Sequence, residues 1–282
     1  MATTGKGTDM TQRLIFTIVF LALSGSVLAC PLQLDQNVSQ GELVIGRAKP
    51  GTHITFKDTD LRIDPASGVF AFGIDRDAEG EAVLAVACTD GTKHLHKLDV
   101  AKREYDIDRI DGLPEKMVTP PKELLERIRR EGKWIRKART RDTEIPHFVD
   151  GFIWPVVGRI SGHYGQQRIL NGKPRSPHLG VDIAAPEGTP IKAAAEGEVL
   201  LAESNLFYTG GTVVIDHGHG VTTIYSHMLA LKVAVGQWIT QGDIIGTLGA
   251  TGRATGPHLD WRINWFQVRL DPELSVGPMR KD

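Results

Sequence analysis

The sequence predicts a mainly β protein, with a small β-sandwich near the N-terminus, a linker helix, and an antiparallel β-sheet domain at the C-terminus. Two parts of the chain carry short apolar runs separated by glycine, proline or aspartate, a pattern typical of strands and turns. One charged stretch between them has helical spacing instead. At 282 residues with 41% hydrophobic residues, the chain is long enough for about two domains.

The first β part is expected to be an accessory β-sandwich over residues 30–110. Turn signals such as Pro50-Gly51 and Asp90-Gly91 separate its apolar runs. His94 and His96 alternate with apolar residues, so we expect them to face solvent rather than to bind a metal. The expected strands are Glu42 to Ile45, Thr52 to Phe56, Val69 to Phe72, Ala82 to Ala87 and Leu95 to Val100.

A linker with a basic helix is expected over residues 111–150. Pro120-Pro121 gives the helix its start, and Lys and Arg outnumber acids by eight to three from Lys122 to Arg139. A solvated helix is the simplest interpretation of this charge. A basic surface that faces an anionic wall polymer is the alternative.

The N-terminus predicts export. Arg13 precedes an apolar run from Leu14 to Leu23, and Val27-Leu28-Ala29 follows, which is the order of a signal peptide over residues 1–29. The run is short of the ~20 apolar residues of a membrane span. We therefore expect a periplasmic or otherwise extracytoplasmic protein, whether translation starts at Met1 or Met10.

The two cysteines, Cys30 and Cys88, fit this location. Cleavage after Ala29 would make Cys30 the first mature residue, where it could carry a lipid anchor or form a disulfide with Cys88. The net charge of -1 and a pI near 6.8 give no general attraction to nucleic acid.

The domain expected over residues 151–282 holds two motifs that could bind a metal. His178 and Asp182 are four residues apart, and His258 and Asp260 are two apart, each beside glycine and proline. On an extended strand, residues two or four apart lie on the same face. One nitrogen and one oxygen from each motif could therefore point toward one ion. The expected strands nearby are Thr212 to Ile215, Thr222 to Tyr225, Trp238 to Ile239 and Ile244 to Leu248.

In this region the sequence resembles the lysostaphin-like M23 zinc metallopeptidases, whose domain is built on a duplicated hybrid motif. The resemblance covers Ile153 to Val276 and follows the family's order of motifs. These are His178-x-x-x-Asp182, Ile183 to Pro190, Ile215 to Gly220, Tyr225-Ser226-His227-Met228, Gly236-Gln237, Gln241-Gly242-Asp243 and Thr255-Gly256-Pro257-His258.

The resemblance implies a zinc endopeptidase that hydrolyses peptides of peptidoglycan. It makes His178 and Asp182 zinc ligands, and His227 and His258 the catalytic histidines. The third ligand of the family is the second histidine of His-x-His, and here that position is Asp260. A carboxylate also binds zinc, so we expect a working site of altered charge. On this view, Asp260→His should bind zinc at least as well.

The alternative is a catalytically silent module of the same fold that binds the wall or activates a cell wall amidase. Outside the motifs, Asn171, Lys173 and Arg175 form a polar loop that could contact substrate. His217 and His219 lie in a glycine-rich turn, where we expect turn hydrogen bonds rather than ligation.

Overall fold

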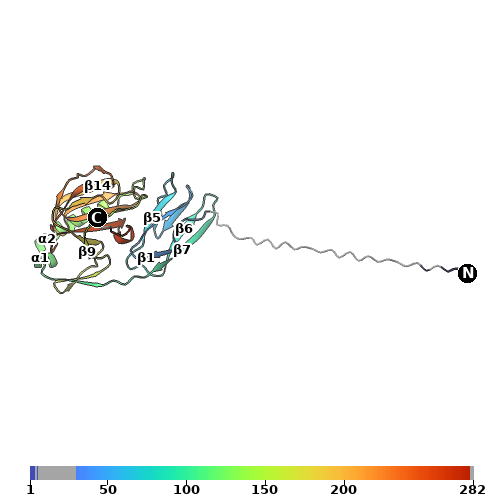
Figure 1. Cartoon of the computed structure of the whole chain (residues 1–282), viewed down its shortest axis with the longest axis horizontal. Coiled ribbons are helices and arrows are strands. Elements are labelled where there is room, and N and C mark those ends of the chain that lie inside the picture. Colours follow the sequence, from blue (N-terminus) through green and yellow to red (C-terminus); the bar gives the residue numbers. More distant parts are fainter. Residues whose placement is uncertain (4, 6–29, 280–282) are drawn as a thin grey trace.

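A computed structural model describes residues 1–3, 5 and 30–279. It confirms a mainly β protein, with two β parts joined by a segment that carries the one long helix among the described residues (Figure 1). The predicted signal peptide lies almost entirely outside the described residues. None of the described helices is long and apolar enough to cross a membrane.

The N-terminal part consists of a five-stranded sheet in the order β1-β7-β6-β3-β4 and a separate β2-β5 pair. Each strand expected from the sequence is present, and β1 and β4 are additional. Along β6, buried and more exposed residues alternate, as expected when one face of a sheet covers a core. The strands are β1 (Asn37–Ser39), β2 (Leu43–Arg47), β3 (His53–Phe56), β4 (Thr59–Leu61), β5 (Val69–Gly73), β6 (Glu81–Ala87) and β7 (Lys93–Ala101).

The connecting segment contains β8 (Ile107–Ile110), α1 (Glu115–Val118) and α2 (Lys122–Ala138). The predicted helix is confirmed, and it begins directly after Pro121, whose missing N–H costs a helix start nothing. Partly buried Ile135 and Ala138 pack against a small apolar cluster of the C-terminal sheet, which comprises Leu201, Leu206, Val214 and Ile224.

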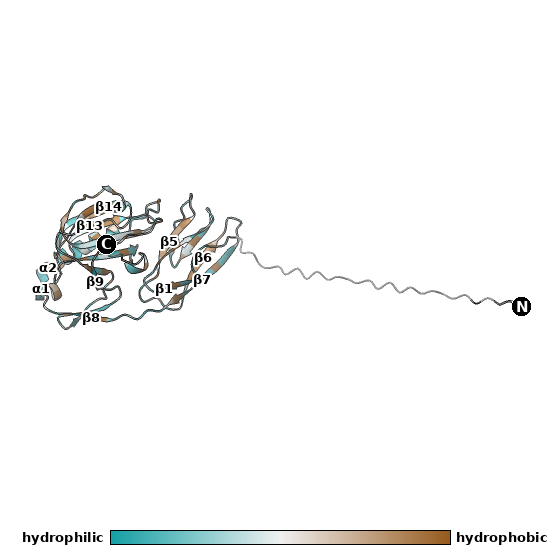
Figure 2. Ribbon diagram, in the orientation of Figure 1, coloured by the Kyte–Doolittle hydropathy of each residue, from teal (hydrophilic) through white to brown (hydrophobic). Residues whose placement is uncertain are grey.

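The C-terminal part is built on a ten-stranded antiparallel sheet whose main order is β17-β14-β15-β16-β19-β12-β9. Figure 2 shows hydrophobic residues along β14, and β15 is buried throughout. The remaining elements are β9 (Arg159–Gly162), β10 (Gln167–Leu170), β11 (Lys173–Pro174), β12 (Val181–Ala184), β13 (Pro190–Lys192), β14 (Gly197–Leu206), β15 (Gly210–Asp216), β16 (Val221–Leu231), β17 (Trp238–Ile239), β18 (Ile244–Leu248), β19 (His258–Trp265), β20 (Val268–Leu270) and η1 (Pro272–Leu274).

The two β parts share one apolar core. The ring of Phe56 lies 4.7 Å from that of Phe72 and 6.1 Å from that of Trp265, measured between centroids. At Gly73 an added Cβ would come within 2.9 Å of Leu270, so the strands approach closely there. The domain boundaries expected at residues 110 and 150 stay a prediction, and the apolar contacts continue across them.

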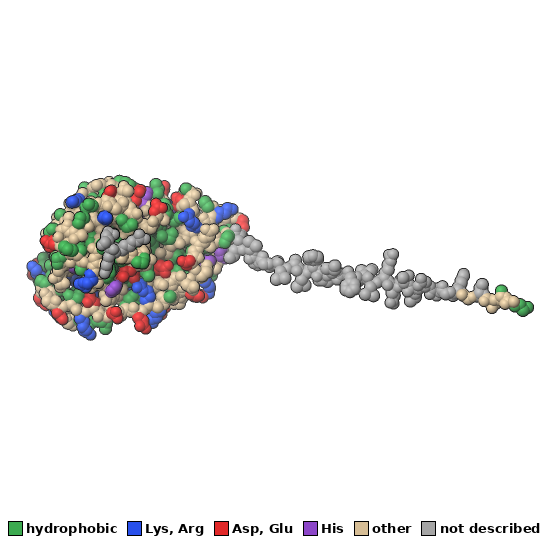
Figure 3. Space-filling view, in the orientation of Figure 1, with side chains coloured by type: hydrophobic (Ala, Val, Ile, Leu, Met, Phe, Trp, Pro, Cys, Tyr) green, Lys and Arg blue, Asp and Glu red, His purple; other side chains and the backbone are tan. Residues whose placement is uncertain are grey.

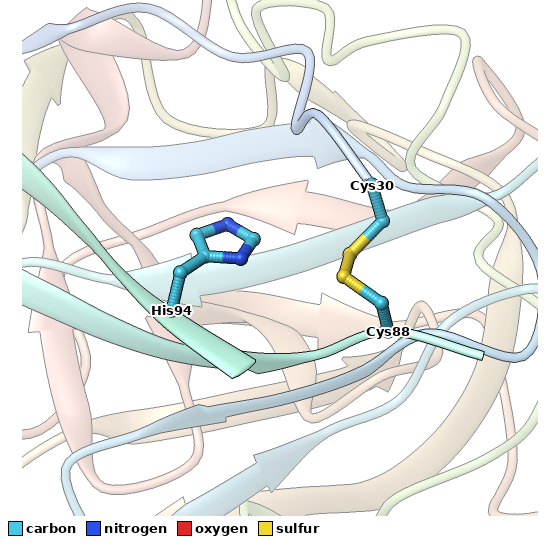
Figure 4. Close-up of side chains that lie close together, drawn as sticks. All are labelled: Cys30, Cys88 and His94. Carbon is cyan, nitrogen blue, oxygen red and sulfur yellow. A yellow bond between two sulfur atoms is a disulfide. The ribbon is translucent and has the colours of Figure 1, made fainter. Parts of the chain in front are cut away.

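Cys30 and Cys88 are joined as a disulfide, with their Cα atoms 5.7 Å apart. Figure 4 shows the ring of His94 beside the bonded sulfur atoms. The expectation that His94 and His96 face solvent is wrong, because both are half-buried and Leu95 between them is 65% exposed. The histidines share their face with buried Leu98, because positions 94, 96 and 98 have the same parity.

Charged side chains of both signs are interspersed on the face seen in Figure 3, as the net charge of -1 suggests. This face presents no large field of one sign.

Phe56→Ala should lower the free energy of unfolding by about 3–5 kcal/mol, because it removes a large ring from the shared core. Denaturant unfolding followed by tryptophan fluorescence would measure it. Leu95→Ala is the matched control, because Leu95 is an exposed apolar residue of the same sheet. It should change stability by less than about 0.5 kcal/mol. Equal effects of the two substitutions would contradict the shared core.

Candidate metal centre and histidine pair

Strands β12 and β19 bring two carboxylates together. They pair in an antiparallel register that sets Asp182 opposite Asp260 and Ala184 opposite His258. Cβ atoms of directly opposed residues lie about 4.5–5.5 Å apart on one face. Buried Val181, Ile183 and Leu259 fix this register, because a slip by one residue would turn them away from the core. The expected strand geometry at positions 258 and 260 is therefore confirmed.

His178 reaches the same point from outside the strand. His178 and Asp182 were expected on one strand. Asp182 lies on β12, but His178 does not, because β12 begins at Val181. The backbone N–H of His178 donates to the carbonyl of Gln166 at 2.8 Å, and its Nε2 lies 3.2 Å from Oδ1 of Asp182. One nitrogen or oxygen from each of His178, Asp182 and Asp260 lies within 4.8 Å of the others.

His227 and His258 form a pair beside these three residues, with ring centroids 4.7 Å apart. Each ring has its Nδ1 at a backbone carbonyl: His227 at Thr251, 2.7 Å away, and His258 at Gly256, 2.8 Å away. A carbonyl only accepts, so both Nδ1 atoms donate, and in the neutral form of each ring Nε2 is the nitrogen with the lone pair. Nε2 of His258 lies 3.9 Å from Oδ1 of Asp182.

The donor set fits a zinc ion. Both ring nitrogens of His178 and Oδ1 of Asp182 are buried and have no hydrogen-bond partner among the described residues. Buried polar atoms normally have a partner, and a metal supplies one. One imidazole and two carboxylates are ligand types that zinc accepts, with room for water in a catalytic site.

The sequence of residues 176–272 matches peptidase family M23. This part of the chain is an M23 peptidase domain. The range includes His178, Asp182, His227, His258 and Asp260. The structure also resembles the crystal structure of a protein described as putative peptidase M23 from Pseudomonas aeruginosa. The TM-score is 0.65 at 28% identity, over 86% of this chain and 95% of that one, so the likeness extends beyond the M23 domain.

Two named bacterial endopeptidases are similar in sequence to about two fifths of this chain. The DD-carboxypeptidase/endopeptidase Mpg of Neisseria meningitidis is 40% identical over 111 residues, which are 39% of this chain and 25% of that protein. The peptidoglycan DD-endopeptidase ShyC of Vibrio cholerae is 41% identical over 122 residues, which are 43% and 28% of the two chains. The match thus spans about a quarter of the length of these relatives.

Two arginines that the sequence analysis missed hold the carboxylates of the M23 domain. Arg168 donates from Nη2 to Oδ2 of Asp182 at 2.5 Å. Arg262 donates from Nε to Oδ1 of Asp260 at 2.7 Å and from Nη2 to Oδ2 at 2.5 Å. Arg262 could have been found from its position two residues after Asp260, because residues two apart lie on one face of a strand.

These contacts decide the charge state of both acids. Burial raises the pKa of the Asp260 carboxyl, but the charge and hydrogen bonds of Arg262 outweigh it and hold that pKa well below its usual range. Burial likewise raises the pKa of the Asp182 carboxyl, while His178 and Arg168 bring it below the ordinary value. Both acids are therefore ionised at neutral pH, as metal ligands must be.

The loop before His178 is bound to the connecting segment. Asn171 donates from Nδ2 to the carbonyl of Leu113 at 2.7 Å, and Arg175 donates from Nη2 to that of Val118 at 2.8 Å. Lys173 is paired with Glu115. These three polar residues, which could have contacted substrate, thus have partners within the chain. Strand β8 also pairs in parallel with β10, the strand that carries Arg168.

The other histidines of the domain have structural partners, as expected for His217 and His219. His217 is fully buried between the carbonyl of Glu196 and the hydroxyl of Thr223, at 2.6 and 2.8 Å. Nε2 of His219 lies 2.8 Å from the carbonyl of Glu144. His163 is exposed and pairs with Glu273.

His217 should make the fold sensitive to acid. Burial lowers its pKa from 6.5 to about 4, so below pH 6.5 the unfolded chain binds a proton that the folded chain does not. Stability from this residue is complete above pH 6.5 and is lost as the pH falls toward 4. Between pH 7 and 5 the loss should be about 2 kcal/mol. Denaturant unfolding of the parent and of His217→Gln at both pH values measures it, and an unchanged pH dependence in the variant would contradict the assignment.

Proposed function

We propose that this protein is a zinc metalloendopeptidase that hydrolyses peptide bonds of peptidoglycan. The observation that carries the proposal is the convergence of His178, Asp182 and Asp260 on one point beside the paired rings of His227 and His258. The endopeptidase names of the relatives over this domain support the substrate class.

In this proposal His178, Asp182 and Asp260 hold the metal. A bound zinc ion supplies Lewis acidity toward the scissile carbonyl and lowers the pKa of water. Arg168 and Arg262 keep the two carboxylates oriented and ionised. Groups that fix metal ligands in this way are as much a part of such a site as the ligands themselves.

His227 and His258 move the proton in this proposal. Their Nδ1–H groups are held by backbone carbonyls, so Nε2 is the atom that accepts a proton. Burial lowers the pKa of His227 to about 4, so its ring is neutral near pH 7 and its Nε2 carries no proton. One of the two rings takes a proton from the attacking water, and one of them later donates a proton to the leaving amine, as general acid–base catalysis requires.

The silent-module alternative is not favoured. It requires the loss of ligand or catalytic groups, whereas all five side chains are present and close together in the fold. The one departure from the family pattern, Asp260, is itself a metal-binding residue type.

The decisive experiment is digestion of isolated peptidoglycan by the purified mature protein, with and without a metal chelator. Peptide fragments released only without chelator would support the proposal, and mass spectrometry would identify the bond. A zinc-loaded protein that releases no fragment from wall material would refute it.

Asp260→Ala and His258→Ala should differ in effect. Asp260→Ala removes a proposed ligand, so zinc content and activity should fall together. His258→Ala should keep zinc, while activity falls by about 10²–10⁴-fold, the usual contribution of a positioned acid–base group. Zinc content is measured beside turnover for both. An Asp260→Ala protein with full zinc and full activity would remove Asp260 from the ligand set.

We also propose that the chain is exported and cleaved before Cys30, in keeping with a wall substrate. In this proposal Cys30 forms a disulfide with Cys88 rather than carrying a lipid anchor, and the bonded, buried sulfur atoms support it. The intact mass of the mature protein should therefore rise by two hydrogen atoms on reduction. A mass increased by acyl chains would support the anchor instead, and an uncleaved chain would argue against export.

A further inference from the structure

We propose that Asp260 and Arg262 act as one unit that takes the place of an imidazole at the third metal position. Arg262 is a positioning residue, which orients the Asp260 carboxylate and neutralises its charge. The inference rests on the proposed metal site, and it does not depend on the substrate.

The geometry allows Asp260 to serve both partners. Arg262 approaches with its planar fork, one N–H to each carboxylate oxygen, at 2.7 and 2.5 Å. Each carboxylate oxygen has two lone-pair sites, so one site on each remains free after the arginine has bonded. Alternation along β19 puts both side chains on the sheet face that also carries Asp182.

The charges match those of the family's usual ligand set. Two imidazoles and one carboxylate carry a formal charge of -1. His178, Asp182 and Asp260 carry -2, and Arg262 brings the sum back to -1. Arg168 pairs with Asp182, so its charge is not part of this comparison between Asp260 and histidine. Asp260 and Arg262 together therefore carry the same net charge as the neutral histidine of the family.

Burial and neighbouring arginines make the Asp260–Arg262 pair costly to break. The Asp260 side chain is 3% exposed and that of Arg262 is 21% exposed. Two further arginines, Arg139 and Arg269, lie near Arg262, and burial followed by repulsion from Arg262 lowers the pKa of Arg139 to about 10. Removing the carboxylate alone would leave Arg262 unpaired among cations and beside the metal, and breaking a buried pair in this way is strongly unfavourable.

This pairing reverses the expectation for Asp260→His. Alone, that substitution should weaken zinc binding by at least about 10-fold, because Arg262 loses its partner next to the ion. Arg262→Gln alone should weaken it by about 10–100-fold, the usual effect of losing a group that orients a ligand. The double variant Asp260→His/Arg262→Gln restores both ligand and charge, so its affinity should return to within a few fold of the parent.

The test is competition of each full-length purified protein with a chromophoric chelator for zinc, after circular dichroism has shown that each variant is folded. An Asp260→His protein that binds zinc as tightly as the parent would overturn the inference. A double variant that binds no better than Asp260→His would also overturn it. Tighter binding by Arg262→Gln would show that the arginine competes with the metal instead.

Arg168→Gln is the matched control, because Arg168 holds Asp182 and not Asp260. It should weaken zinc binding by the same factor in the parent and in the double variant. If Asp260→His does not fold, Arg262→Lys and Arg262→Gln decide the question, since lysine keeps the charge. Arg262→Lys should lose less affinity than Arg262→Gln, and equal affinities of both with the parent would overturn the inference.

Peptidoglycan digestion in parallel separates this inference from the proposed function. Zinc affinities that follow the predicted pattern without release of wall fragments would refute the substrate and support the pairing. Zinc-dependent digestion without coupling between positions 260 and 262 would refute the pairing alone.

Discussion

The site depends on the register of β12 and β19, which places the carboxylate of Asp182 opposite that of Asp260 inside the fold. Two like charges at this distance in a poorly solvated place repel each other strongly, so cations must accompany them. Arg168 and Arg262 provide two such cations, one for each acid. The apolar pair next to the acids, Ile183 and Leu259, holds the register against this repulsion, because any slip would expose these residues.

The rest of the chain supports the loops around this point. The connecting segment is bonded to the loop before His178 through Asn171 and Arg175, and β8 lies beside β10, so Arg168 is positioned by residues outside the M23 match. The N-terminal sheets in turn pack on Trp265 and Leu270, at the far end of β19 and in β20. The part of the protein outside the M23 match is thus in direct contact with the elements that carry the proposed site.

The sequence was informative where spacing determines geometry and uninformative where distant segments meet. Alternation placed His258 and Asp260 on one face correctly, and the proline pair located the start of α2. The same reasoning put His178 on a strand, although its position is set by the carbonyl of Gln166 in a loop. Arg168 could not be found in this way, because its contact with Asp182 joins two different sheets, and no local pattern encodes that approach.

The order of the site residues along the chain also determines when the site can exist. Asp182 lies near the start of the M23 match, whereas Asp260 lies near its end on β19, which pairs with both β12 and β16. Closing such distant strand pairs is a late and slow event in folding, since much chain entropy is lost before the contacts form. A chain in which β19 has not yet paired lacks both Asp260, the third proposed ligand, and His258 at the site. The complete set of proposed ligands and proton-transfer groups therefore arises only with the finished fold, so partly folded chains lack the proposed site.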